Sequence, residues 1–216
     1  MRKIKLRKMP AKEVFTIINR KNLWGSSESI SGPGSEINQT QTLISELPKL
    51  IDKFGIKSML DIPCGDYNWI RRIDFQQLEY TGADIVDVIV NENIRKYESV
   101  NTKFEVLDIT IDALPKRDLV LVRDCFVHLS FVDTKKAINN IHKSGSKYLL
   151  ATTFIDRSVN ADIVTGDWRP INMQISPFNF PDTEYTLLEN CTECDGDYKD
   201  KAMGLWLIEK LPYPLF

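Results

Sequence analysis

The apolar positions of the chain change their spacing near residue 56. Before this point, apolar side chains at helical spacing predict two helices, one within residues 11–23 and one from residue 35 to residue 51. Between them, the stretch "WGSSESISGPGS" (24–35) is rich in Gly, Ser and Pro, which favours an irregular loop. We therefore expect residues 1–50 to form a helical lead-in that includes a lid or cap segment.

Five short apolar runs follow, and helix-compatible segments separate most of them. The runs are SMLDI (58–62), YTGADIV (80–86), KFEVLDI (103–109), DLVLVRD (118–124) and KYLLATTF (147–154). Strands that alternate with helices predict a parallel sheet with helical crossovers. The fourth and fifth runs are apolar nearly throughout, as expected for central strands that are covered on both faces.

The alternation stops after residue 154. A long polar stretch (155–182) leads to two further apolar runs, in "EYTLLENCTE" and "AMGLWLIEKL". Their connection is too short for a helical crossover, so it predicts an antiparallel hairpin. A dinucleotide-binding dehydrogenase would continue with parallel strands, so this ending argues against that class.

Composition and charge set further limits. The 216 residues include 43% hydrophobic and 27% charged residues, and the net charge of −2 disfavours binding to nucleic acid or to an anionic membrane. The four scattered cysteines suggest no disulfide framework, and the basic residues 1–10 lack the apolar stretch of a secretory signal. We expect a cytoplasmic monomer or homodimer. The pair Cys191 and Cys194 has zinc-like spacing but no second pair to complete a site, so no metal is expected.

An acidic residue ends each of the first four strand-like runs. These residues are Asp61, Asp84, Asp108 and Asp124. The carboxyl ends of parallel strands share one edge of the sheet, where ligands bind. Asp84 follows Asp61 at a spacing near that of a ribose-binding carboxylate. Asp108 can accept a hydrogen bond from an exocyclic amine, with Ile85 and Ile109 on either side of an adenine ring. The alternative is a set of helix caps and turn residues.

The turn "DIPCGDYNWI" (61–70) has only one glycine, Gly65. A pyrophosphate needs a glycine-rich turn that lets the backbone close around it. S-adenosylmethionine has no phosphate, and its amino group and sulfonium are compatible with nearby carboxylates. The turn therefore favours S-adenosylmethionine over a nicotinamide dinucleotide.

These motifs resemble those of the class I S-adenosylmethionine-dependent methyltransferases. "LDIPCGDYNWI" looks like their first motif, and "YTGADIV", "VLDIT" and "DLVLVRDCFVHLS" are similar to the next three. The resemblance runs from about Lys57 to the C-terminus. It implies an α/β fold: a three-layer Rossmann-like sandwich with a mostly parallel seven-stranded sheet and an antiparallel C-terminal hairpin strand. It also implies a methyltransferase domain over residues 51–216.

The resemblance further places Asp61, Cys64, Gly65, Asp84 and Asp108 around the cofactor. The predicted cofactor site also includes Pro63, Ile85, Ile109 and Arg123. Asp124 is the first candidate for a base or for a group that orients the acceptor, and the alternative is a carboxylate paired with Arg123. His128 is the second catalytic candidate, although a "HL" pair at this place in similar methyltransferases also fits a scaffold role.

The acceptor pocket is expected to come from residues 24–35 and from residues 166–181. Trp24 and Trp168 are candidates for its walls, Arg169 for a fork that binds an anionic group, and Asn172 for a further contact. Alternatively, the aromatic residues only fix a long loop to the core. The glycines of residues 24–35 are candidate hinges of a mobile lid.

The predicted function is transfer of a methyl group from S-adenosylmethionine to the O or N atom of a small polar acceptor. A sugar or a phosphorylated metabolite would suit Arg169. Two alternatives stay open: an NAD(P)-dependent oxidoreductase on a related fold, and a non-catalytic Rossmann-like interaction domain.

Overall fold

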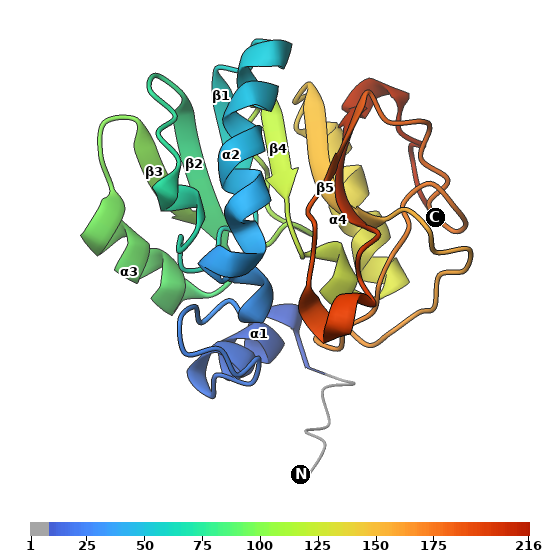
Figure 1. The fold of residues 1–216 in the computed structure, drawn as a ribbon, viewed down its shortest axis with the longest axis horizontal. Coiled ribbons are helices and arrows are strands. Elements are labelled where there is room, and N and C mark those ends of the chain that lie inside the picture. The colour runs from blue at the N-terminus through green and yellow to red at the C-terminus, as the bar shows by residue number, and fades with distance from the viewer. Residues whose placement is uncertain (1–8) are drawn as a thin grey trace.

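A computed structural model describes residues 9–216, so most of the basic stretch at the start of the chain lies outside the described residues. One sheet of seven strands runs through this part of the protein, in the order β3-β2-β1-β4-β5-β7-β6 (Figure 1). The strands are β1 (Ser58–Asp61), β2 (Glu79–Asp84), β3 (Thr102–Val106), β4 (Leu119–Val122), β5 (Tyr148–Phe154), β6 (Tyr185–Leu188) and β7 (Lys201–Leu207). The helices are α1 (Ala11–Arg20), α2 (Ile37–Phe54), α3 (Asp87–Tyr97) and α4 (Phe131–Lys143).

The pairing of the strands confirms the predicted α/β sheet. The first five strands pair in parallel, and β7 runs antiparallel to both β5 and β6. Cβ atoms alternate between the two faces of a strand, so each strand of this sheet contributes to two cores. On β4, Leu119 and Leu121 join the core beneath α2, whereas Val120 and Val122 join the core beneath α4. This is the three-layer sandwich that the resemblance implied, and β4 is covered on both faces as its continuous apolar run predicted.

The predicted boundary at residue 50 falls inside a helix of the core. Helix α2 buries Leu43, Leu47 and Leu50 against the sheet. Its N-terminus follows Glu36 and its C-terminus is closed by Gly55, whose positive φ of 64° suits the end of a helix. The segment that lies outside the sandwich therefore comprises α1 and the connection from α1 to α2.

A long irregular segment, rather than a helix, covers part of the α4 face after β5. Four of its apolar side chains are buried in the same core as Trp206 of β7 (Ile171, Met173, Phe178 and Phe180). The Trp206 indole N–H donates to the carbonyl oxygen of Pro181 at 2.9 Å. This segment is therefore a wall of the core over much of its length.

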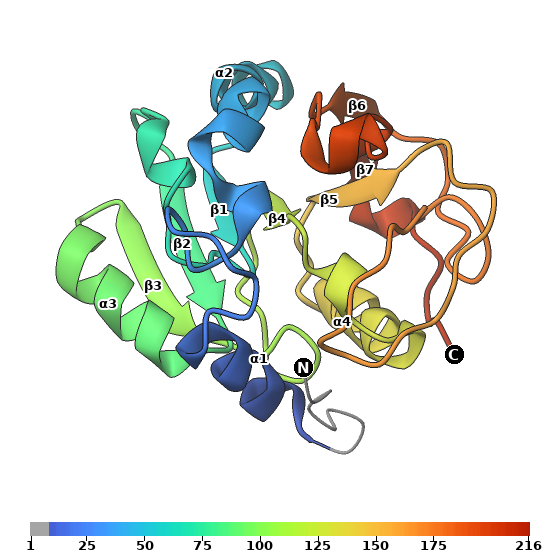
Figure 2. The ribbon, with the colours of Figure 1, turned by 60° about the horizontal axis from the view of Figure 1, so that its bottom comes forward.

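The order of the strands creates the place where a ligand fits. The chain moves outward from β1 to β3 and then returns to pair β4 with β1 on its other side. A crevice forms at the carboxyl ends of the strands where the order reverses in this way. Helix α1 lies across these ends, as the turned view shows (Figure 2). Within residues 9–216, none of the helices has the length and apolar character that crossing a bilayer requires.

Gly204 in β7 lies where the core beneath α4 leaves no room for a larger side chain. A Cβ atom at this position would lie 2.2 Å from the ring of Trp206, which is fully buried. We predict that Gly204→Ala lowers the free energy of unfolding by about 1–3 kcal/mol, because the ring has no room to move. Urea denaturation measures the change. In a Trp206→Leu background the same substitution should cost less, and equal costs in both backgrounds would contradict this packing.

Candidate functional site

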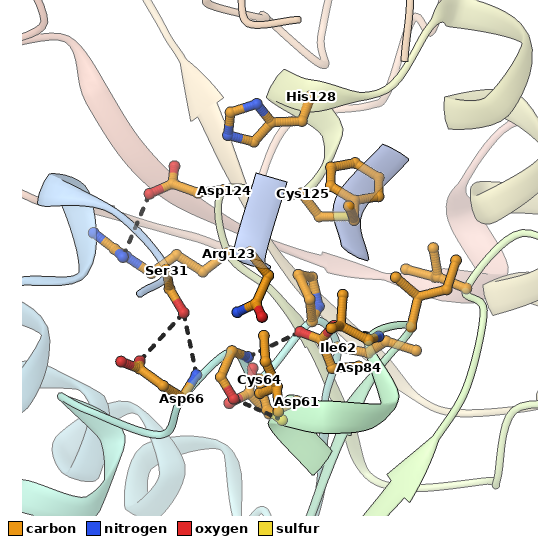
Figure 3. Close-up of a pocket in the computed structure, with 18 of the residues that line it drawn as sticks. Ser31, Asp61, Ile62, Cys64, Asp66, Asp84, Arg123, Asp124, Cys125 and His128 are labelled. Atoms are coloured by element: carbon orange, nitrogen blue, oxygen red, sulfur yellow. Dashed lines mark hydrogen bonds and ion pairs between the residues drawn. The ribbon is translucent and has the colours of Figure 1, made fainter. Parts of the chain in front are cut away.

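A pocket opens at the carboxyl edge of the sheet, between β1, β2, β4 and the segment that includes α1 (Figure 3). It holds about 1080 Å³ of empty space, part of which is open to solvent. Every predicted cofactor and catalytic residue lines it, together with Trp24. These residues are Asp61, Pro63, Cys64, Gly65, Asp84, Ile85, Asp108, Ile109, Arg123, Asp124 and His128.

Asp61 ends β1 and is only 3% exposed. The hydroxyl of Tyr80 donates a hydrogen bond of 2.7 Å to its Oδ2. Burial raises the pKa of Asp61 to about 7, because a buried carboxylate loses its hydration; the Tyr80 hydrogen bond opposes the rise, and the charge of Asp84 adds to it. A cation placed beside Asp61 would favour the ionised form.

Asp84 ties the end of β2 to the turn after β1. Its Oδ2 accepts a hydrogen bond from the Gly65 N–H at 3.2 Å, and its Oδ1 accepts one from the Val86 N–H at 2.9 Å. Burial raises the pKa of Asp84 to about 6, although these backbone hydrogen bonds oppose the rise. Each carboxylate oxygen has a second lone pair, so the group can also accept hydrogen bonds from ligand hydroxyls.

The turn itself is held at Gly65, which has a φ of +53°. Its carbonyl oxygen accepts a hydrogen bond of 2.8 Å from the side-chain amide of Asn93 on α3. The preceding Cys64 is buried, and its N–H donates to the carbonyl oxygen of Ala83 at 2.8 Å. Backbone contacts to β2 thus fix the shape of the turn, and side-chain acids surround it.

A more apolar part of the pocket lies just after the ends of β2 and β3. Ile85, Leu107 and Ile109 line it, and Asp108 stands beside them. The Oδ1 atom of Asp108 accepts hydrogen bonds from the N–H and the hydroxyl of Thr110, at 2.8 and 2.6 Å. This part has the combination of apolar faces and polar edge that an adenine ring needs.

The charge of the lining is strongly acidic. The acids that line the pocket are Asp61, Asp66, Asp84, Asp108 and Asp124, and in the described part of the chain Arg123 is the single Lys or Arg among the lining residues. Arg123 is 6% exposed, and its guanidinium pairs with Glu189 at 2.7 Å and donates to the carbonyl oxygen of Gly34 at 2.8 Å. Little positive charge is left for an anionic ligand.

Asp124 belongs to a buried ionic network that the sequence did not reveal. Lys201 Nζ lies 2.7 Å from its Oδ2, and Arg123 Nη1 lies 3.4 Å from the same atom. Burial opposes ionisation, but these two cations lower the pKa of Asp124 to about 2. Such a carboxylate is a very weak base, so its environment favours an electrostatic or orienting role. Lys201 is the first residue of β7, and Glu189 follows the last residue of β6. They lie near Asp124 because β7 pairs with β5, which pairs with β4.

His128 has a defined hydrogen-bond arrangement. Its Nδ1 lies 2.9 Å from the carbonyl oxygen of Asp167. A carbonyl oxygen only accepts hydrogen bonds, so Nδ1 carries the proton and Nε2 of the neutral ring has the free lone pair. Burial lowers the pKa of His128, which favours this neutral form. The ring of Trp24 packs on the imidazole at a centroid distance of 5.1 Å.

Three of the predicted acceptor residues lie outside the pocket lining. Arg169, expected to offer a fork to an anion, is 5% exposed and donates to the carbonyl oxygens of Phe126, Leu129 and Ala161. Asn172 is also buried and donates to the carbonyl oxygen of Arg157. The reason is physical: the turn after β4 and the long segment both contain backbone carbonyls that a regular helix or strand would satisfy, so polar side chains supply the donors.

Trp168 differs from the expectation in another way. It is 41% exposed and packs on Tyr198 with a ring-centroid distance of 4.9 Å, rather than forming a wall of the pocket. The structure thus favours the alternative in which the aromatic residues of this long segment fix it to the body of the protein.

Several lining residues were not predicted from the sequence, and two groups of them bear on the function. One face of α1 lines it through Ala11, Phe15 and Asn19, which are spaced four residues apart as one helical face requires. Asp66, directly after Gly65, also lines it and binds residues 29–31. The sequence predicted the helix, but it did not show that the face with Ala11, Phe15 and Asn19 would point into the pocket.

Comparison with known proteins adds a relationship in fold. No family model matches the sequence, and no curated protein matches it. Among solved structures, magnesium protoporphyrin IX methyltransferase from Synechocystis PCC 6803 with bound S-adenosylhomocysteine is 13% identical, with a TM-score of 0.51 over 68% of this chain and 72% of that one.

Human N-acetylserotonin methyltransferase in complex with S-adenosylmethionine gives a TM-score of 0.56 at 16% identity. The match covers 91% of this chain and 59% of the human enzyme. Together with the sheet order and the antiparallel hairpin, these similarities establish the architecture. The chain has the fold of the class I S-adenosylmethionine-dependent methyltransferases.

Proposed function

We propose that the protein transfers the methyl group of S-adenosylmethionine to the N or O atom of a small polar acceptor. The observation that carries this proposal is the pair of buried carboxylates, Asp61 and Asp84, at neighbouring strand ends beside a turn with one glycine. Because both carboxylates are buried and repel each other, a ligand that brings a positive charge and hydroxyl donors would stabilise their ionised forms. The bound cofactors of the two structural neighbours support the same choice.

Each part of the cofactor has matching groups in the pocket. Asp61 would accept hydrogen bonds from its amino group, and Asp84 from its ribose hydroxyls. Ile85 and Ile109 would enclose its adenine ring, with Asp108 at the edge. A nicotinamide dinucleotide fits less well, because its pyrophosphate would approach Asp61, Asp84 and Asp66 without the glycine-rich backbone that binds phosphate.

When bound, the cofactor supplies an activated methyl group, so the protein mainly has to align the acceptor and exclude water. Helix α1 and residues 24–35 cover the pocket and would perform the second task. Asp124, His128 and Trp24 would border the acceptor. The neutral Nε2 of His128 would take the proton that an acceptor hydroxyl or amine releases, and the nearby charge of Asp124 would partly offset the burial that disfavours the protonated imidazole.

The lining also bears on the class of acceptor. A phosphorylated acceptor would need a cation, yet Arg123 is paired with Glu189 and Arg169 is committed to backbone carbonyls. The site therefore favours an acceptor without a phosphate, such as a neutral sugar or an amine.

Calorimetry of the purified protein tests the cofactor. We predict binding of S-adenosylhomocysteine and no binding of NAD. Asp84→Ala should weaken the binding by about 1–3 kcal/mol, because a group that accepts ligand hydrogen bonds is lost. Asp87→Asn is the matched control, since Asp87 forms an exposed ion pair with Lys12 and does not line the pocket. Binding of NAD alone, or an unchanged affinity in Asp84→Ala, would contradict the proposal.

The proton acceptor can be tested before the acceptor molecule is known. We predict from nitrogen-15 NMR that His128 titrates below 6.5 and that its neutral ring carries the proton on Nδ1, because the pKa is lowered by burial and Asp167 holds that proton. The chain has two histidines, so His142→Gln assigns the signals. A neutral ring protonated on Nε2 would rule out this role.

A further inference from the structure

The segment between α1 and α2 lies directly over the turn that follows β1. We refer to residues 24–36 as the cap. Within it, Ser31 comes so close to Gly65 that a Cβ atom on Gly65 would lie 2.1 Å from the Ser31 hydroxyl oxygen. The single glycine of the turn is thus required by the cap as well as by its own positive φ. Figure 3 shows Ser31 beside Asp66, at this contact.

One carboxylate carries most of the polar contacts between the cap and the turn. Asp66 Oδ1 accepts hydrogen bonds from the hydroxyls of Ser29 and Ser31, at 2.9 and 3.2 Å. Its Oδ2 accepts one from the N–H of Ile30 at 3.0 Å, and its own N–H donates to the Ser31 hydroxyl at 3.1 Å. Three consecutive residues of the cap are therefore bound to one side chain. Hydrogen bonds to a charged acceptor are stronger than neutral ones.

Other groups hold the cap at Glu28 and near its end at Gly34 and Ser35. The Asn68 amide donates to the carbonyl oxygen of Ser35 at 3.2 Å and to Glu28 Oε1 at 2.7 Å. Arg123 donates to the carbonyl oxygen of Gly34 at 2.8 Å. Three residues of the cap, Trp24, Ser31 and Ser35, also line the pocket, and Trp24 packs on His128. The cap thus contributes to both the cofactor part and the acceptor part of the pocket.

We propose that Asp66 is a positioning residue that holds this cap closed over the bound adenosyl cofactor. The proposal rests on the proposed function for the identity of the ligand. Asp66 acts on the ligand indirectly, because its carboxylate oxygens accept hydrogen bonds from Ser29, Ile30 and Ser31 of the cap. Release of the ligand then requires these hydrogen bonds to break, and the positive-φ glycines Gly25 and Gly32 at either side of the contact give the backbone the freedom to move.

Hydrogen exchange and ligand release test the proposal together, on the full chain. In Asp66→Ala we expect amide exchange in residues 24–36 to rise by about tenfold or more, since three hydrogen bonds to a charged group are lost. Exchange in β4 and β5 should stay as in the wild type, which shows that the protein is folded. The dissociation rate of S-adenosylhomocysteine should rise by a similar factor.

Three further variants show whether the effect of Asp66→Ala comes from the lost hydrogen bonds. Asp66→Asn keeps one carbonyl oxygen and should restore part of the protection and of the slow release, and Ser29→Ala should have a smaller effect than Asp66→Ala. Asp74→Ala is the control, because Asp74 is exposed and, within residues 9–216, its carboxylate accepts only from the nearby Gln76 N–H. It should change neither quantity.

Two results would overturn the proposal. One is exchange in residues 24–36 that is the same in Asp66→Ala as in the wild type. The other is faster exchange with an unchanged dissociation rate, because the cap would then be loosened without any effect on the ligand. If the wild type binds no S-adenosylhomocysteine, the proposed function fails. Exchange in the free protein still decides whether Asp66 holds the cap.

Discussion

The burial of two carboxylates at neighbouring strand ends is the constraint on which the rest of the site depends. Asp61 and Asp84 are each less than a tenth exposed, and burial raises the pKa of both. Burying two acidic side chains near each other costs stability, because each loses its hydration and their charges repel. Such an arrangement is explained if these acids act on a ligand with positive charge, and it would repel a ligand with a pyrophosphate.

The surrounding structure follows from holding these acids in place. The turn after β1 must stay close to β2, so the Gly65 N–H donates to Asp84 and Asn93 holds the Gly65 carbonyl oxygen. The cap and α1 lie over the turn and contribute to the lining of the pocket. In another part of the pocket, Lys201 and Arg123 compensate the charge of Asp124, and the hydrogen bond to Asp167 leaves the lone pair of the neutral His128 ring on Nε2.

The sequence predicted the parts of this structure that depend on local patterns. Apolar runs located the strands, and the short final connection predicted the hairpin of β6 and β7. Acids at strand ends, such as Asp84, were found because parallel strands end at one edge. Contacts between distant segments were not predictable: Lys201 reaches Asp124 only because β7 lies beside β5. Arg169 looked like a ligand-binding residue because the sequence cannot show which backbone carbonyls a long loop leaves to be satisfied.

The most direct test of the central constraint is the number of protons exchanged when S-adenosylhomocysteine binds at pH 6.5, measured by calorimetry in buffers of different ionisation enthalpy. Asp61 and Asp84, with pKa values of about 7 and about 6, are partly protonated at this pH. A bound ammonium group favours their ionised forms, so the account predicts release of up to about one proton, reduced in Asp61→Asn. Binding without proton release, or with proton uptake, would contradict it.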